Sequence, residues 1–251
     1  MIHITDANDS RIAEFISIRD HVLNSKDLII AEAEKLFLQL RASNKPIHKI
    51  LATPTFIERH QLTGDNIFAA DKKVLESVAG FKIEFEVLVL AEKPKDTPLN
   101  QLDNRIIALN GLTSPENVGS IVRSSAAFGI KSILMDEKTC SPYLRRCIRV
   151  SMGNIFAMKT HHALNVRGDL KRLKELGYTI LSTANIPGSV DVADYKFPEK
   201  CILIIGSEGH GIDQDILNLS DTILKIKIDP QVAHLNAANA AAIFLSKMST
   251  L

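Results

Sequence analysis

Apolar runs a few residues long alternate with segments of helical periodicity through the second half of the chain. The runs at 106–109, 132–135, 155–158, 178–182, 201–205 and 223–228 predict strands. The segments at 143–150, 170–176 and 213–217, one from about Asn117 and an alanine-rich one ending near Met248 predict helices. Such alternation is typical of a parallel sheet covered on both faces. We therefore expect an α/β domain in this half.

The first half shows the same kinds of pattern in a smaller unit. Helices are expected at 12–17, 27–41 and 72–78, with Asp27 as a possible N-cap, and strands at 47–52, 66–69 and 85–90. Pro94 and Pro98 lie among charged and polar residues between apolar segments, which is typical of a linker. We therefore predict a small α/β domain at 1–93, a linker at 94–103 and a second domain at 104–251.

Charge and cysteine content narrow the function only slightly. With 30 basic and 29 acidic side chains the formal charge is +1, so a surface that binds nucleic acid must be a local patch. The 3 cysteines form no C-x-x-C pair, which argues against a disulfide framework. The chain shows no secretion signal and no apolar run of about 18 residues. We expect a cytoplasmic protein with no membrane partner.

Three segments place turn residues and polar side chains directly after predicted strands. The first, N-G-L-T-S-P-E-N-V-G-S-I-V-R, starts at Asn110 and carries Asn117 and Arg123. The second is G-S-E-G-H-G, with Glu208 in third place, and the third is H-L-N, which ends at Asn236 before the final helix. In open α/β sheets ligands bind beyond the carboxyl ends of the strands. These segments are therefore the candidates for a site.

Several common cofactor and catalytic motifs are absent from the sequence. The glycines from Gly206 follow the order G-x-x-G-x-G, which is not the dinucleotide fingerprint, and there is no phosphate loop and no G-x-S-x-G. His161 and His162 are adjacent, and no H-E-x-x-H motif or cysteine cluster occurs. These absences argue against nicotinamide cofactors, nucleoside triphosphates and serine hydrolase chemistry. We also predict no metal requirement.

In order, spacing and sequence, the three segments resemble the signature motifs of the SpoU, or TrmH, family of RNA ribose 2′-O-methyltransferases, which belong to the SPOUT class. The resemblance covers roughly residues 104–251. It implies a parallel-sheet SPOUT fold with a deep C-terminal trefoil knot, S-adenosylmethionine as methyl donor and RNA as substrate. It also implies a homodimer formed through the C-terminal domain. Ribosomal and transfer RNA both stay open as substrates.

The same resemblance implies roles for individual residues. Arg123 is expected to act on the target hydroxyl, and the catalytic group as a whole is Arg123, Asn117, Glu208 and Asn236. Backbone groups are expected to hold most of the methyl donor, in a pocket formed by Gly206, Ile226, Leu235, Thr183 and Ala184.

Simpler interpretations of these residues are also open. An isolated arginine on a helix is commonly a solvated residue, Asn117 suits a helix N-cap, and Glu208 suits an exposed turn. A carboxylate directly after a buried strand is expected to have a specific partner, for which Arg123 and the Asn236 amide are the candidates.

One departure from the family pattern concerns the third segment, where His234 stands in place of the usual serine. Imidazole titrates near neutrality and could shuttle a proton, but a packed or exposed histidine fits equally well. His234 and Lys227 also leave room for a noncatalytic RNA-binding protein that retains the SPOUT scaffold. Methylation of a base, as in other SPOUT branches, is a further alternative.

The first domain resembles the substrate-binding domain that often precedes this methyltransferase domain. The sequence L-I-I-A-E-A-E-K from Leu28 matches its early motif, although Ala33 stands where the family usually has glycine. Arg145 and Arg149 share one face of a predicted helix and, with Arg41, are candidates for phosphate contacts. A solvated helix face is the alternative. The resemblance of the first domain implies that residues 1–93 bind RNA.

Overall fold

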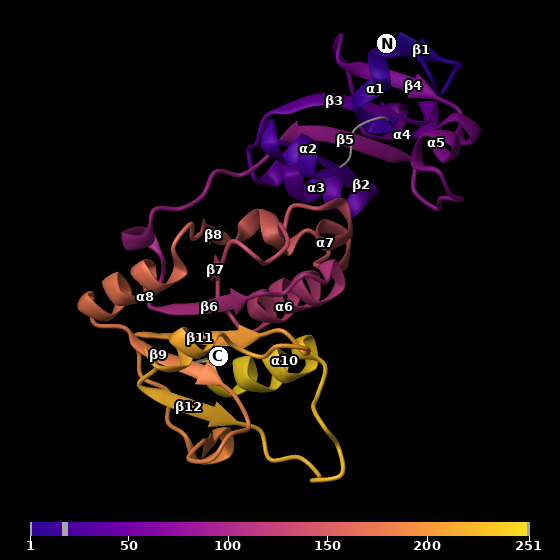
Figure 1. Cartoon of the computed structure of the whole chain (residues 1–251). Coiled ribbons are helices and arrows are strands. Elements are labelled where there is room, and N and C mark those ends of the chain that lie inside the picture. The colour runs from indigo at the N-terminus through magenta and orange to yellow at the C-terminus, as the bar shows by residue number, and fades with distance from the viewer. Residues whose placement is uncertain (1, 17–19, 250–251) are drawn as a thin grey trace. The chain divides into compact units, whose positions relative to one another are not determined.

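The computed structural model describes residues 2–16 and 20–249, and these form two compact units (Figure 1). The first unit contains the chain up to Pro94 together with Tyr143–Phe156, and the second contains Lys95–Pro142 and the chain from Ala157 onward. The division at Pro94 lies where the linker is predicted. The assignment of Tyr143–Phe156 to the first unit differs from the continuous domain expected at 104–251.

The first unit is built on a five-stranded sheet of order β1-β4-β3-β5-β2. β5 runs antiparallel to β3 and β2, whereas β1, β4 and β3 are parallel. The strands are β1 Ile2–Ile4, β2 Leu28–Glu32, β3 Ile47–Ala52, β4 Ile67–Ala70 and β5 Val87–Glu92. The helices are α1 Ala13–Ile16, α2 Asp20–Ser25, α3 Glu34–Ala42, α4 Pro54–Arg59, α5 Lys72–Ala79 and α7 Arg145–Val150.

The helix predicted at 27–41 is wrong in its first half, and its second half is present as α3. Asp27 has a φ of 55°, β2 occupies the apolar run that follows, and α3 starts only at Glu34, after Ala33 with a φ of 85°. Two of the four residues in the run L-I-I-A are β-branched isoleucines. Because the run also pairs antiparallel with β5, it forms a strand and not the first half of a helix. The helix predicted at 12–17 is present as Ala13–Ile16, and Ser17 lies outside the described residues.

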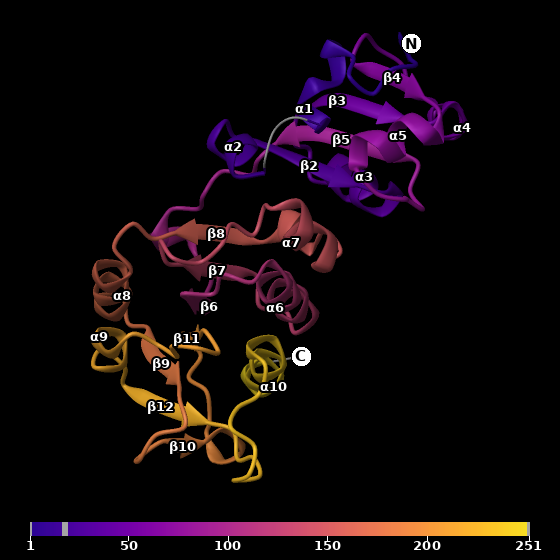
Figure 2. The same cartoon turned by 45° about the vertical axis from the view of Figure 1, so that its right-hand side comes forward.

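The second unit contains a seven-stranded sheet of order β10-β12-β9-β11-β6-β7-β8, with parallel pairing throughout. Its strands are β6 Arg105–Asn110, β7 Ser132–Met135, β8 Lys159–His162, β9 Thr179–Thr183, β10 Val190–Asp191, β11 Cys201–Gly206 and β12 Thr222–Lys225. Figure 2 shows α8 (Val166–Glu175) and α9 (Gln214–Leu217) on one side of this sheet, and α6 (Pro115–Ala127) and α10 (Ala237–Met248) on the other. The predicted parallel-sheet α/β architecture is thus confirmed, and the trefoil knot stays a prediction.

Two strand assignments in the second half of the chain need correction. The strand predicted at 155–158 is a 3₁₀ turn at Asn154–Ala157, and β8 begins only afterwards. β8 reads K-T-H-H, of which Thr160 is buried at 1% exposure, so this edge strand has no apolar run to reveal it. The strand predicted at 223–228 ends at Lys225, and residues 226–236 lead without a regular element into α10.

Candidate functional site

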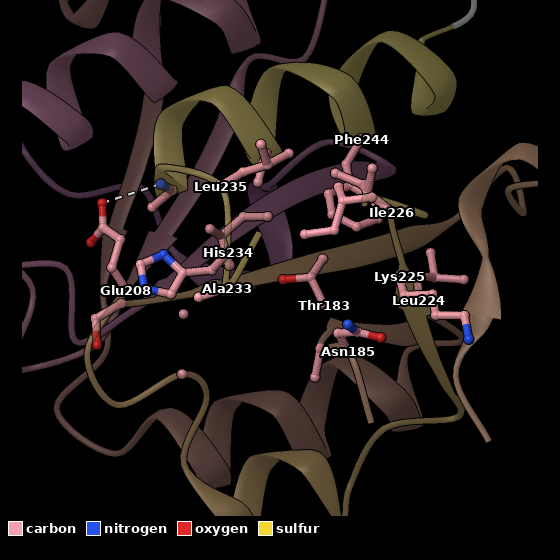
Figure 3. Close-up of a pocket in the computed structure, with 18 residues that line it drawn as sticks. Thr183, Asn185, Glu208, Leu224, Lys225, Ile226, Ala233, His234, Leu235 and Phe244 are labelled. Carbon is pink, nitrogen blue, oxygen red and sulfur yellow. Dashed lines mark hydrogen bonds between the residues drawn. The ribbon is translucent and has the colours of Figure 1, made fainter. Parts of the chain in front are cut away.

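A cavity of about 230 Å³ lies where β9, β11 and β12 end at their carboxyl termini in the second unit (Figure 3). Thr183, Gly206 and Lys225, the last residues of the three strands, all contribute to its wall. The five residues predicted to form the cofactor pocket, namely Gly206, Ile226, Leu235, Thr183 and Ala184, all line it. These residues lie up to 52 positions apart in the sequence, but the parallel strands β12, β9 and β11 are neighbours in the sheet and bring them together.

The two ends of the cavity differ in character. In Figure 3, Glu208 and His234 lie together at one end, and Leu224, Lys225 and Asn185 lie at the other. Apolar lining residues between and around them include Ile226, Leu235 and Phe244. The cavity is therefore acidic at one end and basic at the other.

Gly206 is required by the protein's own backbone. A Cβ at this position would lie 2.4 Å from the carbonyl carbon and oxygen of Gly211, because Ser207 and Gly211 exchange two backbone hydrogen bonds across a tight loop. Gly211 has a φ of +69°, a conformation that favours glycine. A Cβ at Gly209, by contrast, would meet nothing within 4 Å. The glycines therefore shape the loop that presents Glu208 to the cavity.

Glu208 gathers three donors from two separate segments. Its Oε1 accepts hydrogen bonds from the Asn117 side-chain amide at 2.5 Å, the Asn236 side-chain amide at 3.1 Å and the Ala237 backbone N–H at 3.1 Å. Asn236 Nδ2 also donates to Asn117 Oδ1 at 2.9 Å. The three candidate segments thus converge on one carboxylate, and of the two partners predicted for it, the Asn236 amide is the one found.

Helix capping explains why both asparagine side chains have these orientations. The Oδ1 of Asn236 caps α10 by accepting from the N–H groups of Ala238 and Asn239, which leaves its Nδ2 free to donate elsewhere. Asn117 is not a cap, because α6 is capped by Ser114 and starts with Pro115. The N-cap interpretation of Asn117 is therefore wrong, and its amide is available to Glu208 and Asn236.

The surroundings of Glu208 keep it ionised. Burial raises the pKa of this carboxyl, but the hydrogen bonds from Ala237, from its own backbone N–H and from Asn117, with the nearby His234, outweigh burial and leave the pKa below the ordinary 4.5. The donors from Asn117, Asn236 and Ala237 are neutral groups. The cluster therefore retains a full negative charge at the end of the cavity.

Arg123 lies on α6 but outside this cluster. It follows Asn117 by six positions, which is about 9 Å along a helix axis. The side chain is exposed, is not part of the cavity wall, and forms no ion pair with any residue of 2–16 or 20–249. The structure thus brings Asn117, Glu208 and Asn236 together and leaves Arg123 about two turns away along the helix.

The three arginines predicted to contact phosphate all belong to the first unit. Arg145 is bound to Asp20 through its Nε at 2.6 Å and its backbone N–H at 2.9 Å, and Arg149 donates to Glu32 at 3.0 Å. Arg41 is exposed, and its guanidinium lies 5.5 Å from the centre of the Phe37 ring. Arg145 and Arg149 are therefore partly engaged within the protein, whereas no ion pair to Arg41 is found among the described residues.

Other cavity residues carry no motif that would have revealed them. Asn185, Lys225 and Phe244 line the wall because they follow β9, end β12 or sit on the inner face of α10. For Asn185 and Lys225, a position at or just after the end of a strand is the only feature of the sequence that points to the cavity. Among residues 2–16 and 20–249, no group of three metal-ligating side chains comes together, and no helix there is long and apolar enough to cross a membrane.

Comparisons with known proteins agree on one family. The family model for the SpoU rRNA methylases matches residues 104–246, more than half of the chain. An uncharacterized tRNA/rRNA methyltransferase of Mycobacterium bovis is 26% identical over 258 residues, which cover 96% of this chain and 88% of the relative.

Solved structures show the same fold. The AdoMet-bound rRNA methyltransferase from Sinorhizobium meliloti superposes with a TM-score of 0.86 at 20% identity and covers 98% of this chain and 96% of that one. The SpoU methyltransferase AviRb from Streptomyces viridochromogenes, in complex with AdoMet, gives 0.81 at 21% identity over 95% of both chains. The likeness extends over both units of the chain.

Proposed function

Because the chain belongs to the SpoU rRNA methylase family, whose solved relatives bind S-adenosylmethionine, we propose that it methylates the 2′-hydroxyl of a ribose in ribosomal or transfer RNA. RNA methylation with this donor is the activity common to the family. The choice of the ribose hydroxyl rests on the convergence of Asn117, Glu208 and Asn236 beside the cavity.

The cavity suits S-adenosylmethionine in shape and charge. Its volume of about 230 Å³ exceeds the roughly 150 Å³ that holds a benzene ring in an apolar cavity, so an adenine can be enclosed. Glu208 at one end and Lys225 at the other match a ligand that carries both cations and a carboxylate. We assign its binding to the walls formed by Gly206, Ile226, Leu235, Thr183 and Ala184.

When bound, S-adenosylmethionine supplies a methyl group on a cationic sulfonium, which makes the methyl carbon open to in-line attack. The protein's part is to place a hydroxyl oxygen in line with that carbon, since positioning accounts for much of the acceleration in such displacements. The ionised Glu208 favours a cation at its end of the cavity. Asn117 and Asn236 hold the carboxylate in place.

Arg123 is proposed to act on the substrate side of this cluster. An exposed guanidinium with no acidic partner among the described residues can bind a phosphate bidentately and so orient the neighbouring ribose. Its distance from Asn117 along α6 leaves space for a nucleotide between the arginine and the cavity. RNA rather than the methyl donor is therefore its expected contact.

The first unit is proposed to hold RNA through phosphate contacts, with Arg41 as the arginine that has no competing acid among the residues described. Arg145 and Arg149 would contribute the N–H groups that Asp20 and Glu32 leave unused. We further propose a cytoplasmic homodimer formed through the second unit. Val232 and Ile243, exposed by 48% and 39%, support an apolar contact there.

Mass spectrometry of the methylated product tests the proposal directly. Total RNA from cells lacking the protein, incubated with the protein and labelled S-adenosylmethionine, should yield nucleosides that lose the label with the sugar. A label retained on the free base contradicts ribose methylation. The absence of both label and calorimetric cofactor binding would instead favour an RNA-binding protein without catalysis.

The variant Arg123→Ala separates the arginine's role from a structural one. Because Arg123 lies outside the cavity wall, the variant should lose methyl transfer, by about 100-fold or more, while its affinity for S-adenosylmethionine changes little. Equal loss of transfer and cofactor binding would mean that the arginine only supports the fold.

A further inference from the structure

We propose that His234 accepts the proton that the ribose hydroxyl loses during methyl transfer. This inference rests on the proposed function and adds a catalytic residue to it. His234 lies at the acidic end of the cavity beside Glu208 (Figure 3), on the segment between β12 and α10. A ribose hydroxyl is a weak acid, so transfer of its proton to a positioned base lowers the barrier.

Few groups at the cavity can act as a base, and the contacts exclude the others. The Oε1 of Glu208 already accepts three N–H donors, and its lowered pKa makes the carboxylate a weak base. Lys225 carries an ammonium group with donors and no acceptor, and the same holds for the guanidinium of Arg123. Of the acid–base side chains in the cavity wall, namely Glu208, Lys225 and His234, the histidine has a ring nitrogen that can accept a proton and is not already engaged by several protein donors.

The ring of His234 is available for a ligand. The residue is exposed, and no hydrogen bond from either ring nitrogen to another residue of 2–16 or 20–249 is found. Both ring nitrogens are therefore unoccupied by protein groups among the described residues, and the side chain forms part of the cavity wall.

Glu208 is placed to stabilise the imidazolium that forms. His234 contributes to the lowered pKa of Glu208, so the two groups interact electrostatically, and the carboxylate charge is attractive to a cation formed beside it. The other charged groups and histidines on the surrounding elements are His210 and Asp213 in the loop after β11, Lys225 at the end of β12, Lys227 and Asp229 on the same segment as His234, Glu116 and Arg123 on α6, and Lys247 on α10.

The step balances without any further reactant. The ribose oxygen forms a bond to the methyl carbon as the bond between that carbon and sulfur breaks, and S-adenosylhomocysteine leaves as a neutral thioether. The hydroxyl proton moves to a ring nitrogen of His234. The imidazolium then releases the proton to water, which regenerates the base for the next turnover.

The pH dependence of methyl transfer tests this inference. With total RNA from cells lacking the protein as substrate, the wild-type kcat should fall as the pH is lowered, because a base that is already protonated cannot accept the hydroxyl proton. His234→Ala should lower kcat at neutral pH by about 100-fold, flatten this acid limb and regain activity when imidazole is added. Its affinity for S-adenosylmethionine, measured by calorimetry, should stay close to that of the wild type. His234→Asn provides a second, more conservative variant, and circular dichroism checks the fold of both.

His210→Ala is the matched control, because His210 is also exposed and lies close in sequence to Glu208 but is not part of the cavity wall. Its pH profile should match the wild type. An unchanged acid limb in both His234 variants, or a loss explained by weaker cofactor binding alone, overturns the role of His234 while ribose methylation stands. A product methylated on the base overturns the proposed function itself, so the two failures are distinguishable.

Discussion

Two carboxylates, Glu208 in the second unit and Glu32 in the first, are held by contacts between distant parts of the chain but differ in the charge of their partners. Glu32 is buried at 5% exposure and pairs with the Arg149 guanidinium at 3.0 Å. Glu208 is exposed and is held by the amides of Asn117 and Asn236 and the N–H of Ala237. One cluster is charge-balanced, and the other keeps its negative charge.

The charge of the partners distinguishes a structural contact from a site that can bind a ligand. A buried ion pair neutralises itself, and removing one partner leaves a costly unpaired charge in the fold. A carboxylate held by neutral donors is fixed in position, yet its field still reaches the adjoining cavity. The residual charge, rather than the number of hydrogen bonds, is why we propose the Glu208 cluster as the functional one.

Gly206→Ala is expected to have the largest effect on the cavity beside Glu208. The added Cβ would lie 2.4 Å from backbone atoms of Gly211, so the loop that carries Glu208 must move and the cavity wall must distort. We expect S-adenosylmethionine to bind at least 100-fold more weakly, a loss of about 2.7 kcal/mol, in isothermal titration calorimetry.

Gly209→Ala is the matched control in the same loop, because a Cβ there meets nothing within 4 Å. Its cofactor affinity should remain near that of the wild type. If both alanine variants bind the cofactor normally, the loop does not form part of the ligand site, and the contrast between Glu208 and Glu32 loses its functional meaning.

Removing one partner of each carboxylate should affect the free energy of unfolding to different extents, and activity in the opposite order. Arg149→Met leaves Glu32 buried without its counterion, and because Arg149 is 40% exposed we expect a loss of about 2 kcal/mol, below the usual cost for a fully buried pair. Asn117→Ala removes a neutral donor from an exposed carboxylate, which should cost at most about 1 kcal/mol. Urea denaturation measures both changes.

Asn117→Ala, the variant with the smaller loss of stability, should show the larger loss of activity. Asn117→Ala frees Glu208 to move and should lower kcat by about 10-fold or more, whereas Arg149→Met should leave S-adenosylmethionine binding intact. A large stability loss in Asn117→Ala with full activity would show that the Glu208 cluster is the structural one.

The sequence predicts the second unit well because its signals are local. Buried parallel strands produce apolar runs, and polar residues that follow such runs must meet at one edge of the sheet. Glu208, Asn117 and Asn236 could therefore be expected at one edge of the sheet. The five residues expected to hold the cofactor, which all line the cavity, were implied by the family resemblance and not by a local pattern. The edge strand β8 lacks an apolar run and was not predictable in this way.

The division into units depends on contacts that no local pattern encodes. α7 joins the first unit through Asp20 and Glu32, which lie 125 and 117 positions from their arginine partners. Periodicity identifies the helix but not the surface that it covers. The same limit applies to Arg123, whose distance from Glu208 depends on how α6 is oriented and not on motif spacing.

The smallest expected effect is a difference in how the two carboxyls make stability depend on pH. The pKa of Glu208 is lowered in the folded protein, so the stability it adds is full above the ordinary value of 4.5 and is lost as the pH falls through the folded pKa. Burial raises the pKa of Glu32 despite Arg149, so its ionisation opposes folding as the pH rises above 4.5. Urea denaturation between pH 3.5 and 7 should therefore show a shallower acid-side loss of stability in Glu208→Gln, and a steeper rise of stability with pH in Glu32→Gln. A change of slope of the same sign in both variants would mean that the two carboxyls experience the same kind of environment.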